Sequence, residues 1–263
     1  VPGHPNVNVV RIQAGEWKFL PKERIYDVLP ELSKNMIRFV RDNNEYDLYH
    51  GHYVDAGIVT VDVAESLQKP MYFTAHSLGA WKRQQMGGDP EAMEQKFNFR
   101  HRIAEEQRIF DTVNGQTVTS IVQQEKLEEL YSITKNNIEV IPPGVDINRF
   151  HPANQEDLKS FKDLPDNFIF CLSRIDTNKG HDFLLHAFDL VRKKHPDVKL
   201  VIGGGSTNPN DREIEVFEMM DSIIKSKGME DNVLKIGYVP DDLLLGYYQK
   251  SKFFVLPSLF EPF

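Results

Sequence analysis

The stretch FCLSRIDTNKGHDFLLHAF, residues 170–188, combines a buried strand with an amphipathic helix. The strand part is apolar without interruption, as expected for a parallel strand that is covered on both faces. The helix part repeats its apolar residues at helical spacing. Arg174 and Lys179 lie between the two parts. Since ligands bind outside the carboxyl ends of parallel strands, the stretch predicts a βα unit with two cations on its ligand-binding side.

The same alternation of apolar runs and amphipathic segments continues along the chain. It predicts a doubly wound α/β fold with parallel strands. The predicted strands are residues 7–12, 47–50, 71–74, 117–120, 138–141, 168–172, 199–202, 233–236 and 253–256. The predicted helices are residues 22–43, 55–67, 91–111, 122–131, 182–195, 212–227 and 241–249.

One segment interrupts the alternation. IPPGVDINRFHP, residues 141–152, is rich in Pro and Gly, which disfavour a helix and favour an extended turn. The βα pattern restarts after it. The sequence therefore predicts two domains, residues 1–141 and 153–263, joined by a linker at residues 142–152, with ligands bound in the cleft between them.

Composition excludes several classes of protein. The formal net charge of −8 does not suit a protein that coats nucleic acid, so any polyanion site must be local. The single cysteine, Cys171, lies in an apolar run and is interpreted as an inert core thiol. One cysteine fits a reducing compartment, and we expect a cytoplasmic location. No apolar run approaches the length of a membrane span.

Both ends of the sequence are unusual. It opens on VPGHP without an initiator methionine, and it stops at SLFEPF, directly after a predicted core strand. A folded domain rarely ends just beyond a core strand. We therefore expect a piece of a longer chain in which both domains are incomplete.

Candidate ligand-binding residues of the second domain follow its predicted strands. Arg174 and Lys179 suit a phosphate or diphosphate, or they are solvated loop cations. GGGS, which begins with Gly203 and Gly204, either lets the backbone approach a ligand or forms a plain turn. Glu261 precedes a proline at a strand end, where a carboxylate accepts hydrogen bonds from hydroxyls or is merely exposed.

Candidate residues of the first domain include two histidines at strand ends. His52 and His76 are each compatible with a metal ligand, a general base or a hydrogen-bond donor, or with a structural role. Neither helix-spaced histidines nor cysteine partners support a zinc site. Arg102 and Glu106 share one helical face, so a simple ion pair competes with a binding role for Arg102.

RIDTNKG, IPPGVDINRF, HSLG and the final FEPF together resemble the motifs of retaining GT-B glycosyltransferases of the sucrose-synthase type, family 4. HYVDAG, HSLGAWKRQQM and EQKFNFRHRI narrow the resemblance to the bacterial sucrose-phosphate synthase and mannosylfructose-phosphate synthase group. The details of HSLGAWKRQQM and TNKG lean toward the latter. The resemblance covers nearly the whole chain and implies two Rossmann-like domains that face a cleft.

The resemblance implies transfer of a hexosyl group from UDP-glucose or GDP-mannose to fructose 6-phosphate, with retention at the anomeric carbon. As implied catalytic residues, Arg174 and Lys179 neutralise the leaving diphosphate. Glu261 is the first carboxylate of the E-x7-E element and holds the donor sugar, with Gly203 and Gly204 as further donor-binding candidates. His76 faces the donor sugar and the reacting centre. The positions that match acceptor-phosphate ligands are Lys22, Tyr53, Ser77, Lys82 and Arg102.

The resemblance implies small-molecule partners only. No metal or other cofactor is implied, since Arg and Lys balance the charge, and no general base, since the leaving diphosphate takes the acceptor proton. The family's N-terminal glycine loop and the second Glu of E-x7-E do not occur in this sequence.

Two alternatives remain open from the residues. One is a binder of nucleotide sugars or sugar phosphates without turnover. The other is a nicotinamide oxidoreductase, against which the lack of a G-x-G-x-x-G element followed by an acidic residue argues.

Overall fold

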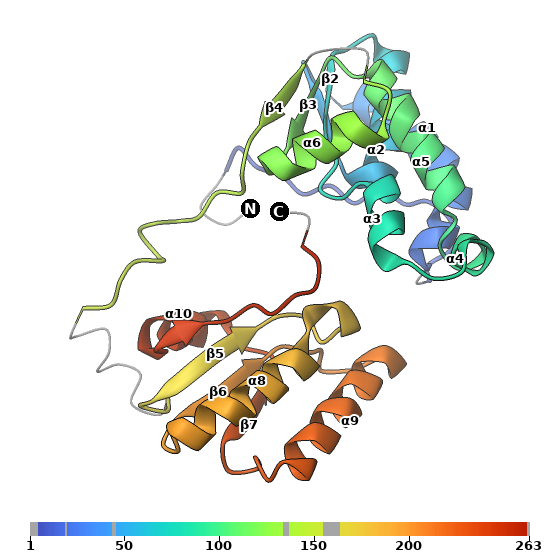
Figure 1. Ribbon diagram of the computed structural model, residues 1–263. Coiled ribbons are helices and arrows are strands. Elements are labelled where there is room, and N and C mark those ends of the chain that lie inside the picture. Colours follow the sequence, from blue (N-terminus) through green and yellow to red (C-terminus); the bar gives the residue numbers. More distant parts are fainter. Residues whose placement is uncertain (1–4, 19, 44–45, 134–136, 155–163, 262–263) are drawn as a thin grey trace. The chain divides into compact units, whose positions relative to one another are not determined.

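The computed structural model describes residues 5–18, 20–43, 46–133, 137–154 and 164–261. The described residues fall into two compact units, one ending at Pro143 and one spanning Gly144–Glu261. Each unit contains a four-stranded sheet in which all described pairings are parallel (Figure 1). The predicted α/β class is therefore confirmed.

The sheet of the first unit has the strand order β1-β2-β3-β4. In its register, His52 lies opposite Thr74 and Thr74 lies opposite Thr117. The carboxyl ends of these three strands are thus side by side. The strands are β1 (Tyr49–His52), β2 (Met71–Thr74), β3 (Gly115–Val118) and β4 (Ile138–Val140).

The helices of the first unit pack closely on this sheet. A Cβ at Gly57 would lie 2.6 Å from side-chain atoms of both Phe73 and Ile109, so α2 contacts β2 and α5 at short range. The described helices are η1, a 3₁₀ helix (Lys22–Val28), and α1 (Leu29–Asp42), α2 (Tyr53–Leu67), α3 (Gly79–Met86), α4 (Pro90–Phe97), α5 (Phe99–Thr112) and α6 (Ile121–Leu130).

The second unit is a three-layer structure with strand order β7-β6-β5-β8. On β5, Ile169 and Cys171 pack with α8 and α9, whereas Phe168 and Phe170 pack on the opposite face with Tyr247 of α10 (Figure 1). The elements are β5 (Phe168–Leu172), η2 (Thr177–Lys179), α8 (His181–Lys194), β6 (Lys199–Gly203), α9 (Asp211–Ser226), β7 (Val233–Gly237), α10 (Asp241–Lys250) and β8 (Phe253–Phe254).

Cys171 is fully buried in this core. Burial raises the pKa of its thiol to about 11, because the interior disfavours the charged thiolate. The predicted core position of Cys171 is confirmed, and the raised pKa agrees with an unreactive thiol.

The predicted strand at residues 7–12 is wrong. This segment forms no regular secondary structure, and Val9 is 74% exposed. A strand needs a hydrogen-bonding neighbour, and within the described ranges none lies beside this segment.

Two predicted helices are each divided in the structure. The helix predicted at residues 22–43 is η1 followed by α1, because Pro30 lacks the N–H that a continuous helix requires at that position. The helix predicted at residues 91–111 is α4 followed by α5. Asn98 separates them in a left-handed conformation with φ of 51°.

α3 is absent from the predicted helices. Its N-cap residue, Leu78, offers no side-chain cap. The first N–H of the helix, that of Gly79, donates to Glu106 Oε2 over 2.8 Å, and the N–H of Ala80 donates to the Tyr131 hydroxyl over 3.0 Å. The cap thus comes from residues remote in sequence, which no local signal reveals.

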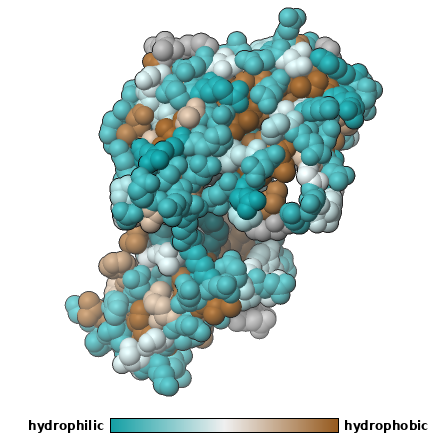
Figure 2. Space-filling model, turned by 90° about the vertical axis from the view of Figure 1, so that its right-hand side faces the viewer, coloured by the Kyte–Doolittle hydropathy of each residue, from teal (hydrophilic) through white to brown (hydrophobic). Residues whose placement is uncertain are grey.

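The exposed surface is mixed. On the face shown in Figure 2, hydrophilic residues predominate and hydrophobic residues form separate patches. Within the described part of the chain, no helix is both long enough and apolar enough to cross a bilayer.

Gly180 connects η2 to α8 at a point where two backbone segments almost touch. Its φ is +67°, and a Cβ there would lie 2.2 Å from the carbonyl oxygen of Pro257. The N–H of Leu259 also donates to the carbonyl of Asn178 over 2.9 Å. The absence of a side chain at Gly180 therefore lets the Lys179 loop lie against the segment that follows β8.

We predict that Gly180→Ala lowers the free energy of unfolding more than Gly228→Ala does. Gly228 has a similar φ of +59°, but no heavy atom lies within 4 Å of its Cβ position. Both substitutions place alanine at positive φ, a cost of about 1–2 kcal/mol, and Gly180→Ala adds overpacking worth about 1–3 kcal/mol. Urea unfolding followed by circular dichroism measures both, and equal losses would contradict the proposed contact.

Candidate functional site

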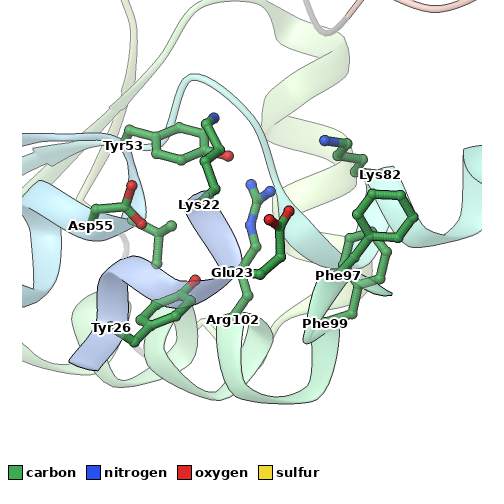
Figure 3. A pocket seen from close by; sticks show the side chains of 10 residues that line it. Lys22, Glu23, Tyr26, Tyr53, Asp55, Lys82, Phe97, Phe99 and Arg102 are labelled. Carbon is green, nitrogen blue, oxygen red and sulfur yellow. The ribbon is translucent and has the colours of Figure 1, made fainter. Parts of the chain in front are cut away.

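A pocket in the first unit brings together cations from separate elements (Figure 3). Lys22 comes from η1, Lys82 from α3 and Arg102 from α5, and Tyr53 begins α2. In Figure 3, the amino group of Lys82 points toward the side of the pocket where Arg102 lies. Four of the five residues predicted to bind an acceptor phosphate thus line one pocket. Ser77 does not line it, but its carbonyl oxygen accepts a hydrogen bond from Arg102.

Arg102 is held rigidly at this pocket. Its Nε donates to Glu106 Oε1 over 2.8 Å, and its Nη2 donates to the carbonyl oxygen of Ser77 over 2.9 Å. Burial alone would lower the pKa of Arg102, but the charge of Glu106, its hydrogen bond and the nearby Tyr53 and Tyr131 together raise the pKa. The competing interpretation, an ion pair within α5, is therefore also correct. The pair fixes the same guanidinium that lines the pocket.

Glu106 organises this part of the unit. Its side chain is only 1% exposed, and it accepts hydrogen bonds from Arg102, from the N–H of Gly79 and from the Tyr131 hydroxyl. A buried carboxylate is stable only when it is paired and hydrogen-bonded. One side chain therefore joins α5 to the start of α3 and the end of α6. The sequence indicated Glu106 only as a partner of Arg102.

Tyr53 lies between two of the cations. The ammonium of Lys22 is 4.1 Å from the centre of its ring, and the guanidinium carbon of Arg102 is 5.0 Å away. Both distances suit cation–π attraction. Tyr53 has a φ of +71°, a left-handed conformation that costs a non-glycine residue about 1–2 kcal/mol. This strained residue follows the last residue of β1 and is the first residue of α2.

Carboxylates also line the pocket. Burial raises the pKa of Asp55, and the charges of Lys22 and Arg102 oppose that shift. Glu23 lies on another wall of the same pocket. A mixture of fixed cations and carboxylates suits a ligand that carries both an anionic group and neutral hydroxyls. No spacing in the sequence pointed to Glu23 or Asp55.

Two histidines lie in β1, and a third lies just beyond the carboxyl end of β2. His52 Nδ1 is 2.8 Å from His76 Nε2, and the rings of His50 and His52 stack with centroids 4.2 Å apart. His50 Nε2 is in turn 2.8 Å from the Thr74 hydroxyl. His76 has a φ of +55°. The structure thus joins the two histidines that were singled out from the sequence.

In the second unit, Lys179 and Glu261 form an ion pair. The Lys179 side chain is 10% exposed and that of Glu261 is 30% exposed. Burial alone would raise the pKa of Glu261, but hydrogen bonds from Lys179 and Ser258 and the charges of Lys179 and Arg174 together hold the pKa below its usual value. The two residues are 82 positions apart in the chain but lie side by side in the structure.

Arg174 is exposed and lines a second pocket with Gly204, Ser206 and Tyr238. Gly204 has a φ of +128°, and a Cβ there would lie 1.8 Å from the carbonyl oxygen of Ser173. Only glycine fits this close approach.

Gly203 is placed differently from Gly204. Its Cβ position faces the side chains of Val239 and Leu172, at 2.7 and 3.0 Å. The structure gives Gly203 a packing role, and its donor-binding role stays a prediction. Among the described residues, no three His, Cys, Asp or Glu side chains are arranged to ligate a metal ion.

Comparisons with known families match both parts of the chain. Residues 2–149 match the model described as Glycosyltransferase Family 4, and residues 153–263 match the model described as Glycosyl transferases group 1. The chain therefore belongs to the group 1/family 4 glycosyltransferases.

Two curated relatives give a finer likeness. The chain is 36% identical to the mannosylfructose-phosphate synthase of Agrobacterium fabrum, over 98% of this chain and 58% of that protein. It is also 36% identical to a probable sucrose-phosphate synthase of Thermosipho melanesiensis, over 76% of this chain and 48% of that protein. The chain thus spans about half the length of these relatives.

A solved structure gives the fold. The sucrose-phosphate synthase of Thermosynechococcus elongatus superimposes with a TM-score of 0.81 and 24% identity, over 97% of this chain and 60% of that one. The fold is GT-B, and the resemblance drawn from the motifs is confirmed at the level of the family.

We predict that Glu106→Gln lowers the free energy of unfolding of the first unit by about 3–5 kcal/mol, because it leaves the buried guanidinium of Arg102 without a charged partner. Trp81 on α3 is 6% exposed and reports unfolding by fluorescence, whereas Trp17 is 94% exposed.

The matched control is Glu105→Gln, on the same helix. Glu105 forms a partly exposed ion pair with Arg108, so its loss costs about 0–1 kcal/mol. Similar urea midpoints for the two variants would contradict the role assigned to Glu106.

Proposed function

We propose that the protein is a retaining glycosyltransferase that moves a hexosyl group from a nucleotide sugar to fructose 6-phosphate. The observation that carries the proposal is the pocket where Lys22, Lys82 and Arg102 meet. Both curated relatives are named as synthases of phosphorylated disaccharides, which supports a phosphorylated acceptor.

The acceptor phosphate binds in this pocket. A phosphomonoester carries up to two negative charges and needs several donors, which three cations supply. Arg102 is already oriented by Glu106 and Ser77, so little side-chain entropy is lost when it binds. Asp55 and Glu23 accept hydrogen bonds from sugar hydroxyls.

The donor diphosphate binds to the second unit, at the loop that follows β5. Arg174 and Lys179 lie in this loop, and Lys179 sits beside Glu261. The cations balance the charge that grows on the diphosphate as its bond to the sugar breaks. Glu261 accepts hydrogen bonds from the sugar hydroxyls, and His76 contributes a further contact to the donor sugar.

The proposed reaction balances without a cofactor. The bond between the anomeric carbon and the diphosphate breaks, and the acceptor hydroxyl oxygen bonds to the same face of that carbon. The hydroxyl proton passes to the leaving diphosphate. UDP-glucose gives sucrose 6-phosphate, and GDP-mannose gives mannosylfructose phosphate.

A second candidate is a binder of nucleotide sugars and sugar phosphates without turnover. This candidate retains both anion sites but predicts no product.

The decisive experiment measures release of nucleoside diphosphate from UDP-glucose and from GDP-mannose, with fructose 6-phosphate present or omitted. Fructose without phosphate is the control acceptor. Acceptor-dependent release with one donor establishes the transferase and identifies its sugar. No release from either donor, with UDP or GDP binding intact, supports the binder.

We predict that two lysine substitutions separate the two substrates. Lys179→Ala lowers turnover with either donor by about 10²–10³-fold, since it removes a charge that stabilises the transition state. Lys82→Ala raises the KM for fructose 6-phosphate about 10–100-fold through loss of a charged contact, and it leaves the donor KM unchanged.

Steady-state kinetics with each substrate varied in turn measure both effects. Normal turnover in Lys179→Ala, or a raised donor KM in Lys82→Ala, would contradict the assigned sites. Thermal unfolding of each variant checks that the fold is intact.

A further inference from the structure

Polar side chains lie next to one another across the carboxyl ends of the neighbouring strands β1, β2 and β3. His52 ends β1, Thr74 ends β2, and His76 follows β2 by two residues. The Thr74 hydroxyl contacts His50 Nε2 at 2.8 Å and the Thr117 hydroxyl at 2.5 Å. These side chains therefore include His76, which the proposed function places at the donor sugar, together with two histidines that have no assigned role.

The contact between His52 and His76 constrains the protons of both rings. Two ring nitrogens 2.8 Å apart form a hydrogen bond only if one of them carries a hydrogen and the other does not. The bond therefore couples the tautomer of His76 to that of His52. If Nε2 accepts, the ring proton of His76 is on Nδ1; if Nε2 donates, Nδ1 is an acceptor.

The backbone and the neighbouring ring support this contact. His76 has a φ of +55°, which is uncommon for a residue other than glycine and is retained where the surroundings demand it. The ring of His50 stacks on His52, and His50 is itself held by Thr74. The His52 ring is thus held both by the stacked ring of His50 and by its contact with His76.

We infer that His52 is a positioning residue: its Nδ1 holds the imidazole of His76 in one orientation and one tautomer, so that the free nitrogen of His76 presents a defined donor or acceptor to the sugar. The inference rests on the proposed function for its kinetic consequence only. The tautomer itself is a property of the protein without substrate.

The charges around the rings agree with this role. Burial lowers the pKa of His76, and the neighbouring His52 lowers it further. The pKa of His50 is lowered by burial and by His52 and His76. The charged or titratable groups that shift these two pKa values are all histidines, so a second proton in the cluster meets repulsion without a countercharge. Neutral imidazoles are therefore favoured near pH 7.

The test compares His52→Leu with His52→Asn. Leucine removes the hydrogen bond, whereas asparagine places an amide near the position of Nδ1, and its nitrogen can donate or its oxygen can accept to restore the bond. His186→Leu, which removes an exposed histidine of the other unit, is the control for loss of a histidine. Nitrogen-15 NMR of the imidazole ring reports the tautomer of His76 directly.

We expect a single His76 tautomer in the wild-type protein and in His52→Asn, and a mixture of tautomers in His52→Leu. The wild-type tautomer pattern in His52→Leu would overturn the inference, as would a mixture in the wild-type protein. Neither outcome depends on activity, so the inference fails separately from the proposed function.

The kinetic readout applies once turnover is established. We expect His52→Leu to lower kcat about 10-fold with the KM for fructose 6-phosphate unchanged, and His52→Asn to restore most of the loss. The acid limb of the pH profile should also shift in His52→Leu, because His52 no longer lowers the pKa of His76. An unchanged kcat and pH profile would overturn the positioning role.

Discussion

The buried carboxylate of Glu106 is the constraint on which the first unit depends. A charged group at 1% exposure is tolerated only when donors surround it, and here the donors come from α5, from the start of α3 and from the end of α6. The same carboxylate therefore caps one helix, anchors a second and orients Arg102. Arg102 belongs both to this buried hydrogen-bond network and to the lining of the candidate acceptor pocket.

Sequence patterns predicted the helices and strands whose formation depends on residues that are close together in the chain. The uninterrupted apolar run of β5 and the helical spacing of α8 were enough to predict a parallel βα unit. The helix breaks at Pro30 and Asn98 were not predicted. α3 could not be predicted, because its cap is a glutamate 27 residues away. The segment at residues 7–12 has strand-like composition but lacks a neighbour within the described residues.

The candidate site, like the fold, could be predicted from the sequence only in part. Lys22, Lys82 and Arg102 were recognisable by motif resemblance, and the structure brings them to one pocket. Asp55 and Glu23 carry no spacing signal, since their importance lies in burial and in the cations that face them. The bond between the two imidazole rings depends on the register of β1 against β2, which no pattern within a single strand encodes.

The ion pair between Lys179 and Glu261 changes how ligand affinity must be understood in the second unit. Each charge is partly withdrawn from water and already has a partner, so an anion that approaches Lys179 competes with a carboxylate and gains only the difference between two ion pairs. The carboxylate released by that exchange becomes free to accept hydrogen bonds elsewhere. Affinity for a simple anion is therefore expected to be modest, and a ligand that offers both a negative group and hydroxyls satisfies the two side chains together.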